Sequence, residues 1–450
     1  MIALSLSHER TKMNRRQFIT GASSVGLMSL ADWRAFAAED GLPAYYGDHL
    51  ADVAQRVRER AAKGRDAFWF ITDPHVPSNR KMSGRVMAKL IAETGVRKVV
   101  CGGDIPEAFG GRESVERSMA EFRTHWIDPV EAVGGRFYLA KGNHDFTIRE
   151  SMKSQNGFTV DGRAAAAYIL GTSAANGVTK NDADSECAYY YFDEPKARLR
   201  YIVIDTTDSI SPTRKFWAVE NGVHPRQLAW LREKAFGTLP KGWSAVVVHH
   251  IPVTGVVGND GDEKTFANVR ELLNAHADQI VLDITGHQHR ECQTCQHGIW
   301  HVTEPCDAAY GDYIKGGLPW CPNLPWKNKG TVYENTFDAV VVGKDARIDF
   351  VRVGGGADRT LLRGVVQVKV GETHRFATAL GAVKWGCYDA DRVTFKPDPD
   401  NRWTRLLEYH ADVATISAQG VLAGRKPGES VVVALAPDGR KELFPVAVIK

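Results

Sequence analysis

Five short apolar runs along the chain each end in a cluster of Asp, Asn or His residues. Short runs of β-branched and aromatic residues are typical of buried strands. The clusters are Asp73-Pro74-His75, Gly102-Gly103-Asp104, Gly142-Asn143-His144-Asp145, His249-His250 and Gly286-His287-Gln288-His289. Because α/β folds place ligands at the carboxyl ends of their strands, this pattern predicts one polar site to which all five clusters contribute.

Segments with a helical spacing of apolar residues alternate with these runs. A polar helix is expected between about residues 38 and 64, where Leu50, Val53 and Val57 share one face. Further helices are predicted at 83–94, 113–132, 225–237 and 265–276, and further strands at 188–192, 199–205, 337–342 and 346–353. Mixed helices and strands in this order predict an α/β domain over residues 38–353.

The pattern changes after the glycines at 354–356, and residues 354–360 are expected to form a linker. Short alternating runs then follow, such as 365–368, 392–395 and 431–434, separated by turns and without helical spacing. This pattern predicts a small all-β sandwich over residues 361–450.

The composition is that of a globular protein, with 43% hydrophobic and 25% charged residues among 450. This length predicts two or three domains. The formal net charge is +3 and there is no dense basic run, so charge gives no indication of a nucleic-acid partner.

The N-terminus has the features of an export signal. Arg15-Arg16 precedes a moderately apolar segment, and Ala35-Phe36-Ala37 has the form of a cleavage site. Residues 1–37 are therefore predicted to be a twin-arginine signal, with Met13 a better start than Met1. This signal predicts a periplasmic or exported protein that engages the twin-arginine export machinery and crosses the membrane already folded.

The side chains of the five clusters indicate metal binding. Asp, Asn and His without thiolate suit Mn, Fe, Zn or Co. The candidate ligands are Asp73, His75, Asp104, Asn143, His250, His287 and His289. These are too many for one zinc ion, which usually takes three or four protein ligands. Two divalent metal ions bridged by one carboxylate would use them all, and Asp104 is assigned to the bridge.

The five clusters, in this order, resemble those of the calcineurin-like metallophosphoesterases. The resemblance implies a four-layer α-β-β-α sandwich in which Asp73, His75 and His289 hold the first metal. It also implies that Asn143, His250 and His287 hold the second metal, with Asp104 between them. His144 would contact the phosphoryl group or protonate the leaving oxygen, and Asp145 would orient the His144 ring.

The implied reaction is hydrolysis of a phosphate ester by a hydroxide that bridges two metals. The metals would also offset the charge on the phosphate oxygens. Proton donation by a residue such as His144 is typically worth about 100-fold to 10,000-fold in rate. The sequence does not separate phosphodiesters from phosphomonoesters. Glu107 stands where purple acid phosphatases have a tyrosine ligand, which argues against a purple enzyme.

One histidine assignment is open. Alternation along a strand points the rings of His249 and His250 to opposite faces, so one of the two is expected to be a ligand. The family spacing of histidine, one residue and proline fits His250-Ile251-Pro252 and favours His250.

The stretch between His289 and Phe337 reads as a loop insertion rich in cysteine and aromatic residues. Cys292, Cys295 and Cys306 could form a structural zinc site with His297 and His301. The alternatives are a disulfide among these three cysteines and Cys321, or free thiols. The aromatic residues could line a substrate pocket or pack the loop, and 254–264 is a second candidate lid. Cys101 is predicted to be a buried thiol.

The C-terminal segment resembles bacterial immunoglobulin-like domains of the group 2 kind. The similarity lies in residues 412–422 and in the turn at 426–429. It implies a binding or spacing module, with an envelope component as a candidate partner. The alternative to a hydrolase is therefore an envelope-binding or adhesion protein with a vestigial metal domain, but the intact ligand set favours the hydrolase.

Overall fold

A computed structural model describes most of the chain after residue 40. The described residues are 41–76, 82–106, 112–148, 158–161, 163–184, 188–208, 213–214, 221–254, 262–307, 314–315, 330–345, 347–399 and 401–450. The predicted export signal, Glu107, Cys321 and most of the candidate lid at 254–264 lie outside them. No helix in these ranges combines the length and apolarity that crossing a membrane requires.

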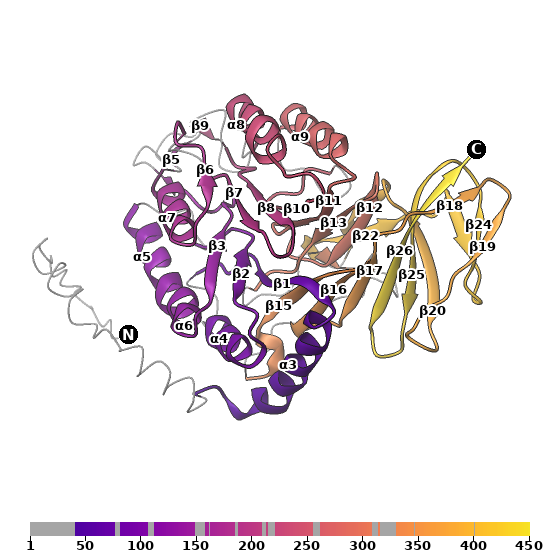
Figure 1. Cartoon of the computed structure of the whole chain (residues 1–450), viewed down its shortest axis with the longest axis horizontal. Helices are drawn as coiled ribbons and strands as arrows, with labels where there is room; N and C mark the ends of the chain where they lie inside the picture. The colour runs from indigo at the N-terminus through magenta and orange to yellow at the C-terminus, as the bar shows by residue number, and fades with distance from the viewer. Residues whose placement is uncertain are drawn as a thin grey trace, which may run out of the picture. The chain divides into compact units, whose positions relative to one another are not determined.

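The first sheet has ten strands and contains three of the predicted cluster-bearing strands (Figure 1). Its order is β20-β25-β26-β17-β16-β15-β1-β2-β3, and β18 pairs with β26 beside this path. The strands are β1 (Gly64–Ile71), β2 (Lys98–Cys101), β3 (Arg136–Leu139), β15 (Thr336–Gly343), β16 (Arg347–Gly354), β17 (Arg359–Leu362), β18 (Val366–Lys369), β20 (Lys384–Asp389), β25 (Gly428–Leu435) and β26 (Lys441–Ile449). Because β1, β2 and β3 are parallel and adjacent, their carboxyl ends lie side by side.

The second sheet has seven strands in the order β12-β13-β11-β10-β8-β7-β6. They are β6 (Thr179–Lys180), β7 (Tyr190–Glu194), β8 (Leu199–Ile204), β10 (Ser244–His249), β11 (Ile280–Thr285), β12 (Cys292–Gln296) and β13 (Ile299–Thr303). Strands β8, β10, β11 and β13 are parallel. The remaining two cluster-bearing strands, β10 and β11, are therefore also neighbours with aligned carboxyl ends.

Helices cover the outer faces of the two sheets. They are α3 (Gly47–Ala61), α4 (Ser83–Thr94), α5 (Arg112–Phe122), α6 (Asp128–Ala132), α7 (Arg163–Ala174), α8 (Pro225–Trp230) and α9 (Glu263–Ala275), with π-helical turns at Arg123–Ile127 and Leu231–Phe236 and 3-10 turns at Ala44–Tyr46 and Val332–Glu334. The predicted helix at 83–94 is confirmed, and the one at 113–132 is a run of three helical pieces.

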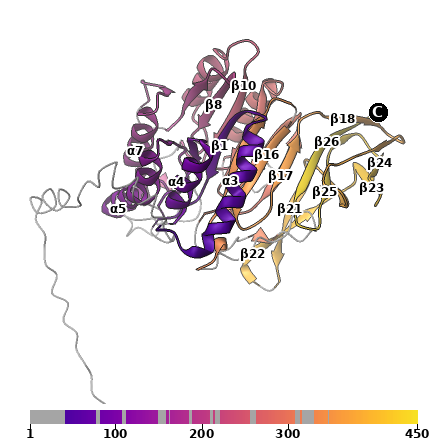
Figure 2. The same cartoon turned by 60° about the horizontal axis from the view of Figure 1, so that its bottom comes forward.

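Two apolar clusters show how these layers pack. Val246 and Val248 of β10 belong to the cluster that also contains residues of the first sheet, whereas the alternating residues Ala245 and Val247 pack with residues of α8 and α9. Figure 2 shows α3 and α4 along the first sheet. The alternation of the second-sheet strands thus separates an inner face, against the first sheet, from an outer face covered by helices.

The C-terminal region is rich in strands, as predicted, and part of it continues the first sheet. Two small sheets, β14-β22-β21 and β19-β24-β23, accompany it, and a third, β4-β5-β9, lies earlier in the chain. Their strands are β4 (Thr147–Ile148), β5 (Phe158–Asp161), β9 (Thr213–Arg214), β14 (Ile314–Lys315), β19 (Thr373–Arg375), β21 (Val393–Asp398), β22 (Asn401–Tyr409), β23 (Ala414–Ile416) and β24 (Val421–Gly424).

The segment 354–360, expected as a linker, differs from that expectation. Gly354 ends β16, and Arg359 begins β17, which pairs with β16 on one side and with β26 on the other. Arg359 is 1% exposed. The glycine run marks a tight bend between paired strands, a conformation that composition does not distinguish from a linker.

The cysteines that the structure describes form no disulfides with one another. They are Cys101, Cys292, Cys295, Cys306 and Cys387, and all five are buried. Cys292 and Cys295 both lie on β12, where three positions of separation place them on opposite faces. A disulfide among the three described members of the predicted group is therefore absent.

Candidate metal centre

Five strand ends converge to form the site. The clusters after β1, β2 and β3 come from the first sheet, and those after β10 and β11 come from the second. Hydrogen bonds join loops of the two sheets directly: His287 N donates to Asp73 Oδ2 at 3.0 Å, and His250 Nδ1 donates to Gly102 O at 2.8 Å. The two sheets thus meet at the predicted polar site.

The first group of candidate ligands consists of Asp73, His75 and His289. His289 Nε2 lies 3.1 Å from Asp73 Oδ1 and 3.0 Å from His75 Nε2. All three side chains are buried. These are the residues that the resemblance assigns to the first metal.

The second group consists of Asp104, His250 and His287. His250 Nε2 lies 3.1 Å from Asp104 Oδ2 and 3.0 Å from Asn143 Oδ1. Asp104 also groups with His75 and His144, and its Oδ2 lies 4.0 Å from His75 Nε2. Its carboxylate therefore faces ligands of both groups, the position that a bridging residue requires.

The donor atoms fit a cation. His250 Nδ1 donates to Gly102 O at 2.8 Å, so Nε2 of the neutral ring has a lone pair that points at Asp104 and Asn143. Burial opposes protonation here, but the Asp104 and Asp73 carboxylates raise the pKa of His250 to about 9. In the metal-free chain a proton therefore takes the place of a cation, and metal binding is expected to release it.

Most of the candidate ligands have a left-handed backbone conformation. The φ angles are 53° at Asp73, 44° at His75, 56° at Asp104, 71° at His287 and 51° at His289. Non-glycine residues rarely adopt this conformation, which costs on the order of 1 kcal/mol or more at each position. The conformation turns these side chains sharply out of the strand ends and toward one another.

Two glycines allow the loops to approach closely. A Cβ at Gly142 would lie 2.2 Å from Asp104 Oδ1, and one at Gly286 would lie 1.9 Å from Thr72 Oγ1. Both distances are far below van der Waals contact. The glycine that opens each of these clusters is therefore required by the packing of the neighbouring loop.

The structure favours His250 over His249 as the ligand. Both ring nitrogens of His249 contact other groups: Nδ1 lies 2.8 Å from Ile251 O and Nε2 lies 2.7 Å from Asp283 Oδ1. The other Asp283 oxygen contacts His301 Nδ1 at 2.6 Å. His249 thus belongs to a buried network around Asp283, together with His301, which the sequence made a candidate ligand of a structural zinc site.

We expect substitutions of the two histidines to separate activity from stability. His250→Gln should lower turnover by about 100-fold or more, as removal of a fixed catalytic donor commonly does. His249→Gln should leave turnover of the folded protein within a few-fold of the wild type. It should lower the free energy of unfolding by about 3 kcal/mol, because Asp283 loses a buried partner. Steady-state kinetics and urea unfolding measure the two effects, and a reversed pattern would assign the ligand role to His249.

Asp145 has a different role from the predicted one. Its Oδ2 accepts the Gly142 and Asp104 backbone N–H groups at 2.7 and 3.0 Å, and its Oδ1 accepts that of Ile105 at 2.9 Å. These contacts fix the loops after β2 and β3 against each other. Burial and the Asp104 carboxylate raise the pKa of Asp145. Asp145 therefore orients the backbone of the site, and the described contacts of its carboxylate are with the main chain.

His144 lies beside Asp104 and is only partly buried. Its side chain is 22% exposed, against 2% for Asp104. Its Nε2 lies 3.9 Å from Asp104 Oδ2, and its ring makes an edge contact with His75. The ring thus lies beside the donor groups and reaches solvent, where a substrate would enter.

A buried ion pair near the site was missed in the sequence. Lys141 Nζ lies 2.8 Å from Asp205 Oδ2, and Asp205 also accepts backbone N–H groups from Ala188 and Thr207. Asp205 follows β8 as the first residue of an Asp-Thr-Thr-Asp run. A polar run after an apolar strand was the same signal that identified the other clusters. The pair anchors the loop that contains Asn143 and His144.

Asp205→Asn should make the free energy of unfolding less dependent on pH in the acidic range. Burial opposes ionisation, but Lys141 lowers the pKa of Asp205, so this carboxylate stabilises the fold fully above its unfolded value of about 3.9. The variant should lose about 3–5 kcal/mol at neutral pH, and the difference from wild type should shrink as pH falls below about 3.9. Urea unfolding across this range measures it, with Asp182→Asn, at a site 88% exposed, as the control. A difference that is constant with pH would contradict the prediction.

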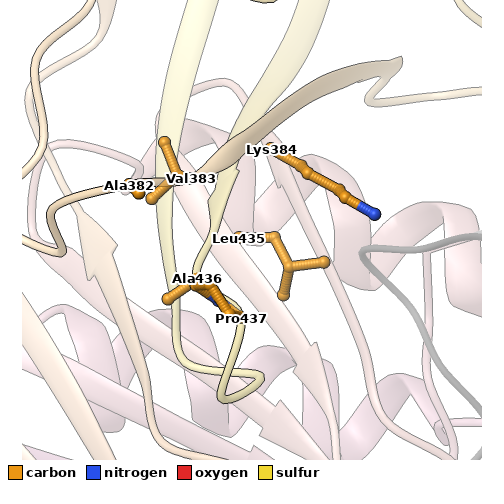
Figure 3. Close-up of a pocket in the computed structure, with 6 residues that line it drawn as sticks. All are labelled: Ala382, Val383, Lys384, Leu435, Ala436 and Pro437. Atoms are coloured by element: carbon orange, nitrogen blue, oxygen red, sulfur yellow. The ribbon is translucent and has the colours of Figure 1, made fainter.

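A pocket elsewhere in the chain lacks the features of a catalytic site. It has a volume of about 540 Å³ and is lined by 382–384 at the start of β20 and by 435–437 at the end of β25 (Figure 3). Lys384 is its one charged lining residue, and none of the candidate metal ligands reaches it. The pocket therefore belongs to the C-terminal strands and not to the metal centre.

Comparisons with known proteins point to one family. A family model described as calcineurin-like phosphoesterase matches residues 67–291, a range that includes every candidate ligand. No curated protein matches the chain. Similar solved structures include a dimetal phosphatase from Danio rerio, with a TM-score of 0.47 and 15% identity over 67% of this chain and 100% of that one. A second is GAP50, the anchor in the inner membrane complex of Plasmodium, with a TM-score of 0.37 and 12% identity over 63% of this chain and 84% of that one. A third is phosphopantetheinyl hydrolase from Mycobacterium tuberculosis, with a TM-score of 0.30 and 16% identity over 54% of this chain and 91% of that one.

Proposed function

Because the chain belongs to the calcineurin-like phosphoesterase family and is a metallophosphoesterase, we propose that it hydrolyses phosphate esters with two divalent metal ions. The observation that supports this most directly is the convergence of two ligand groups on the Asp104 carboxylate. The ligands would be Asp73, His75 and His289 for one ion, Asn143, His250 and His287 for the other, and Asp104 for both. Mn, Fe, Zn and Co all suit these donors.

Two ions held there would supply positive charge to the phosphate oxygens and would acidify a water molecule. The chain itself positions the ester and excludes water, since the ligands are held at buried strand ends. His144 is the proton donor in this proposal. Its ring is partly open to solvent, where a substrate would bind, and its backbone N–H donates to Asp104 Oδ1 at 2.7 Å, which fixes it beside the bridging carboxylate. This arrangement suits protonation of an alkoxide leaving group.

We also propose that the enzyme works in the periplasm or outside the cell. The support is the twin-arginine pattern within residues 1–37, which makes the export machinery a partner. The C-terminal strands, with their group 2 immunoglobulin-like pattern at 412–422, are proposed to bind or space the enzyme against an envelope component. Residues 361–450 contain their own apolar cluster, which is consistent with such a module.

The test is turnover of residues 38–450 on paired chromogenic mono- and bis-aryl phosphates, with metal content measured on the same sample. About two ions per chain and preference for one ester would support the proposal and choose between monoesters and diesters. Two ions without turnover of either ester would point to a narrower phosphate ester. A chain that binds no divalent ion would overturn the two-metal proposal.

A further inference from the structure

Six charged side chains form a buried cluster outside the metal centre. The acids are Glu291, Glu304 and Asp338, and the bases are Arg352, Arg359 and Lys441. Each side chain is at most 6% exposed. Buried charges are costly unless they are paired with good geometry, so a cluster of this size requires a compensating role or dense pairing.

The pairing is dense. Arg352 Nε lies 2.8 Å from Asp338 Oδ1, and Arg352 Nη2 lies 2.8 Å from Glu291 Oε2. Arg359 Nη1 lies 3.1 Å from Asp338 Oδ2. Arg359 also contacts Glu304, and Lys441 contacts Glu291. Burial alone would raise the pKa of Glu291, but Lys441 and the two arginines hold it well below its usual range.

Two members of the cluster adjoin the loops of the metal centre. Glu291 follows the candidate ligand His289 by two residues, in the short connection to β12. Glu304 N donates to Thr285 O at 2.9 Å, and Thr285 ends β11, two residues before His287. Glu291 and Glu304 therefore hold the two ends of the segment that contains His287 and His289.

Lys441 comes from the other end of the chain. It is the first residue of β26, which joins the first sheet through β17. Other C-terminal residues hold the same β12–β13 hairpin: Tyr388 donates to Gln293 O at 2.6 Å, and Gln296 Nε2 donates to Ala390 O at 3.0 Å. The C-terminal strands thus hold the hairpin that directly follows the metal-binding histidines.

We propose that Lys441 is a positioning residue of the metal centre, acting through Glu291 on the backbone at His289. The inference rests on the proposed two-metal site. Metal ligands must stay within about 0.5 Å of their productive geometry, and residues behind the ligands commonly contribute 10-fold to 100-fold to metal affinity. Without Lys441, the Glu291 carboxylate keeps Arg352 but loses its ammonium partner, so the connection from His289 to β12 is held less firmly.

The test compares Lys441→Met with wild type in equilibrium zinc binding by chelator competition, at a temperature where circular dichroism shows all variants folded. The Met variant should lose about 10-fold in affinity for one of the two ions and retain the other. Lys441→Arg, which restores a cation, should recover most of the affinity. Lys426→Met, at a C-terminal lysine whose side chain is 48% exposed, is the matched control and should bind as wild type does.

A double-mutant cycle identifies the ion affected. Combined with His289→Ala, the Lys441→Met change should have no further effect on the remaining ion, whereas combined with His250→Ala its 10-fold effect should persist. Equal affinities in wild type and Lys441→Met, with only a lower unfolding temperature, would overturn this inference alone. A wild-type chain that binds no ion would overturn the proposed function as well. Lys441→Gln provides the same comparison if the Met variant does not fold.

Discussion

Asp104→Asn should lower turnover of phosphate esters by more than about 1,000-fold while the protein stays folded. The change removes the charge that faces both ligand groups, and loss of a single fixed donor already costs about 100-fold to 1,000-fold in other enzymes. The fold should persist because Asn has the same shape and is among the residues that best tolerate the left-handed backbone of Asp104, where φ is 56°. The loss of activity is therefore expected without unfolding.

Three measurements on the same sample test this prediction: steady-state turnover, bound metal per chain and cooperativity of urea unfolding. Metal content should fall below that of wild type, and the unfolding transition should remain single and cooperative. Asp438→Asn, at a side chain 53% exposed, is the control for the chemical change and should leave all three quantities unchanged. Turnover close to wild type in Asp104→Asn would exclude a bridging role for this carboxylate.

Removal of residues 361–450 should abolish the folded state of the remaining chain. The deletion takes away β25 and β26 and cuts β17 after Thr360, so the first sheet ends at β16. It also removes Val431, Val433 and Leu443, which belong to the same apolar cluster as the strands of the metal centre. Three buried aliphatic side chains of this kind stabilise a protein by several kcal/mol, a large part of a typical total of about 5–15 kcal/mol. The loss of Lys441 adds to this effect.

The comparison is between residues 38–360 and residues 38–450, expressed and purified in the same way. The shorter chain should be insoluble or should lack a cooperative unfolding transition, whereas the longer chain should show one. A soluble 38–360 protein with full metal content and a cooperative transition would show that the C-terminal strands are dispensable for folding.

The convergence of the candidate ligands could be predicted because its signals are local. Each apolar run ends directly before its ligands, so the residues that define a strand also place the polar side chains at its end. The choice between His249 and His250 came from side-chain alternation and from spacing to Pro252, both of which are read within a few residues. Features of this kind do not depend on contacts between distant parts of the chain.

The continuity of the first sheet could not be predicted in the same way. β17 pairs in parallel with β26, about eighty residues further on, and the sequence of neither strand indicates which strand it pairs with. The burial of the charged cluster could not be predicted for the same reason. From the sequence, Arg352 and Lys441 are expected to be exposed to solvent, and only the fold places Glu291 beside them. The left-handed backbone angles of the candidate ligands could not be predicted either, because Asp and His do not indicate a positive φ angle as glycine does.

That left-handed conformation has a consequence for engineering this enzyme. Glycine would relieve the strain at Asp73, His75 or His289, and asparagine would relieve part of it, so such changes are favourable for the backbone. The same changes remove a candidate metal ligand. A library of variants selected only for resistance to heat would therefore enrich inactive proteins, and selection for a thermostable enzyme must score catalysis in every round.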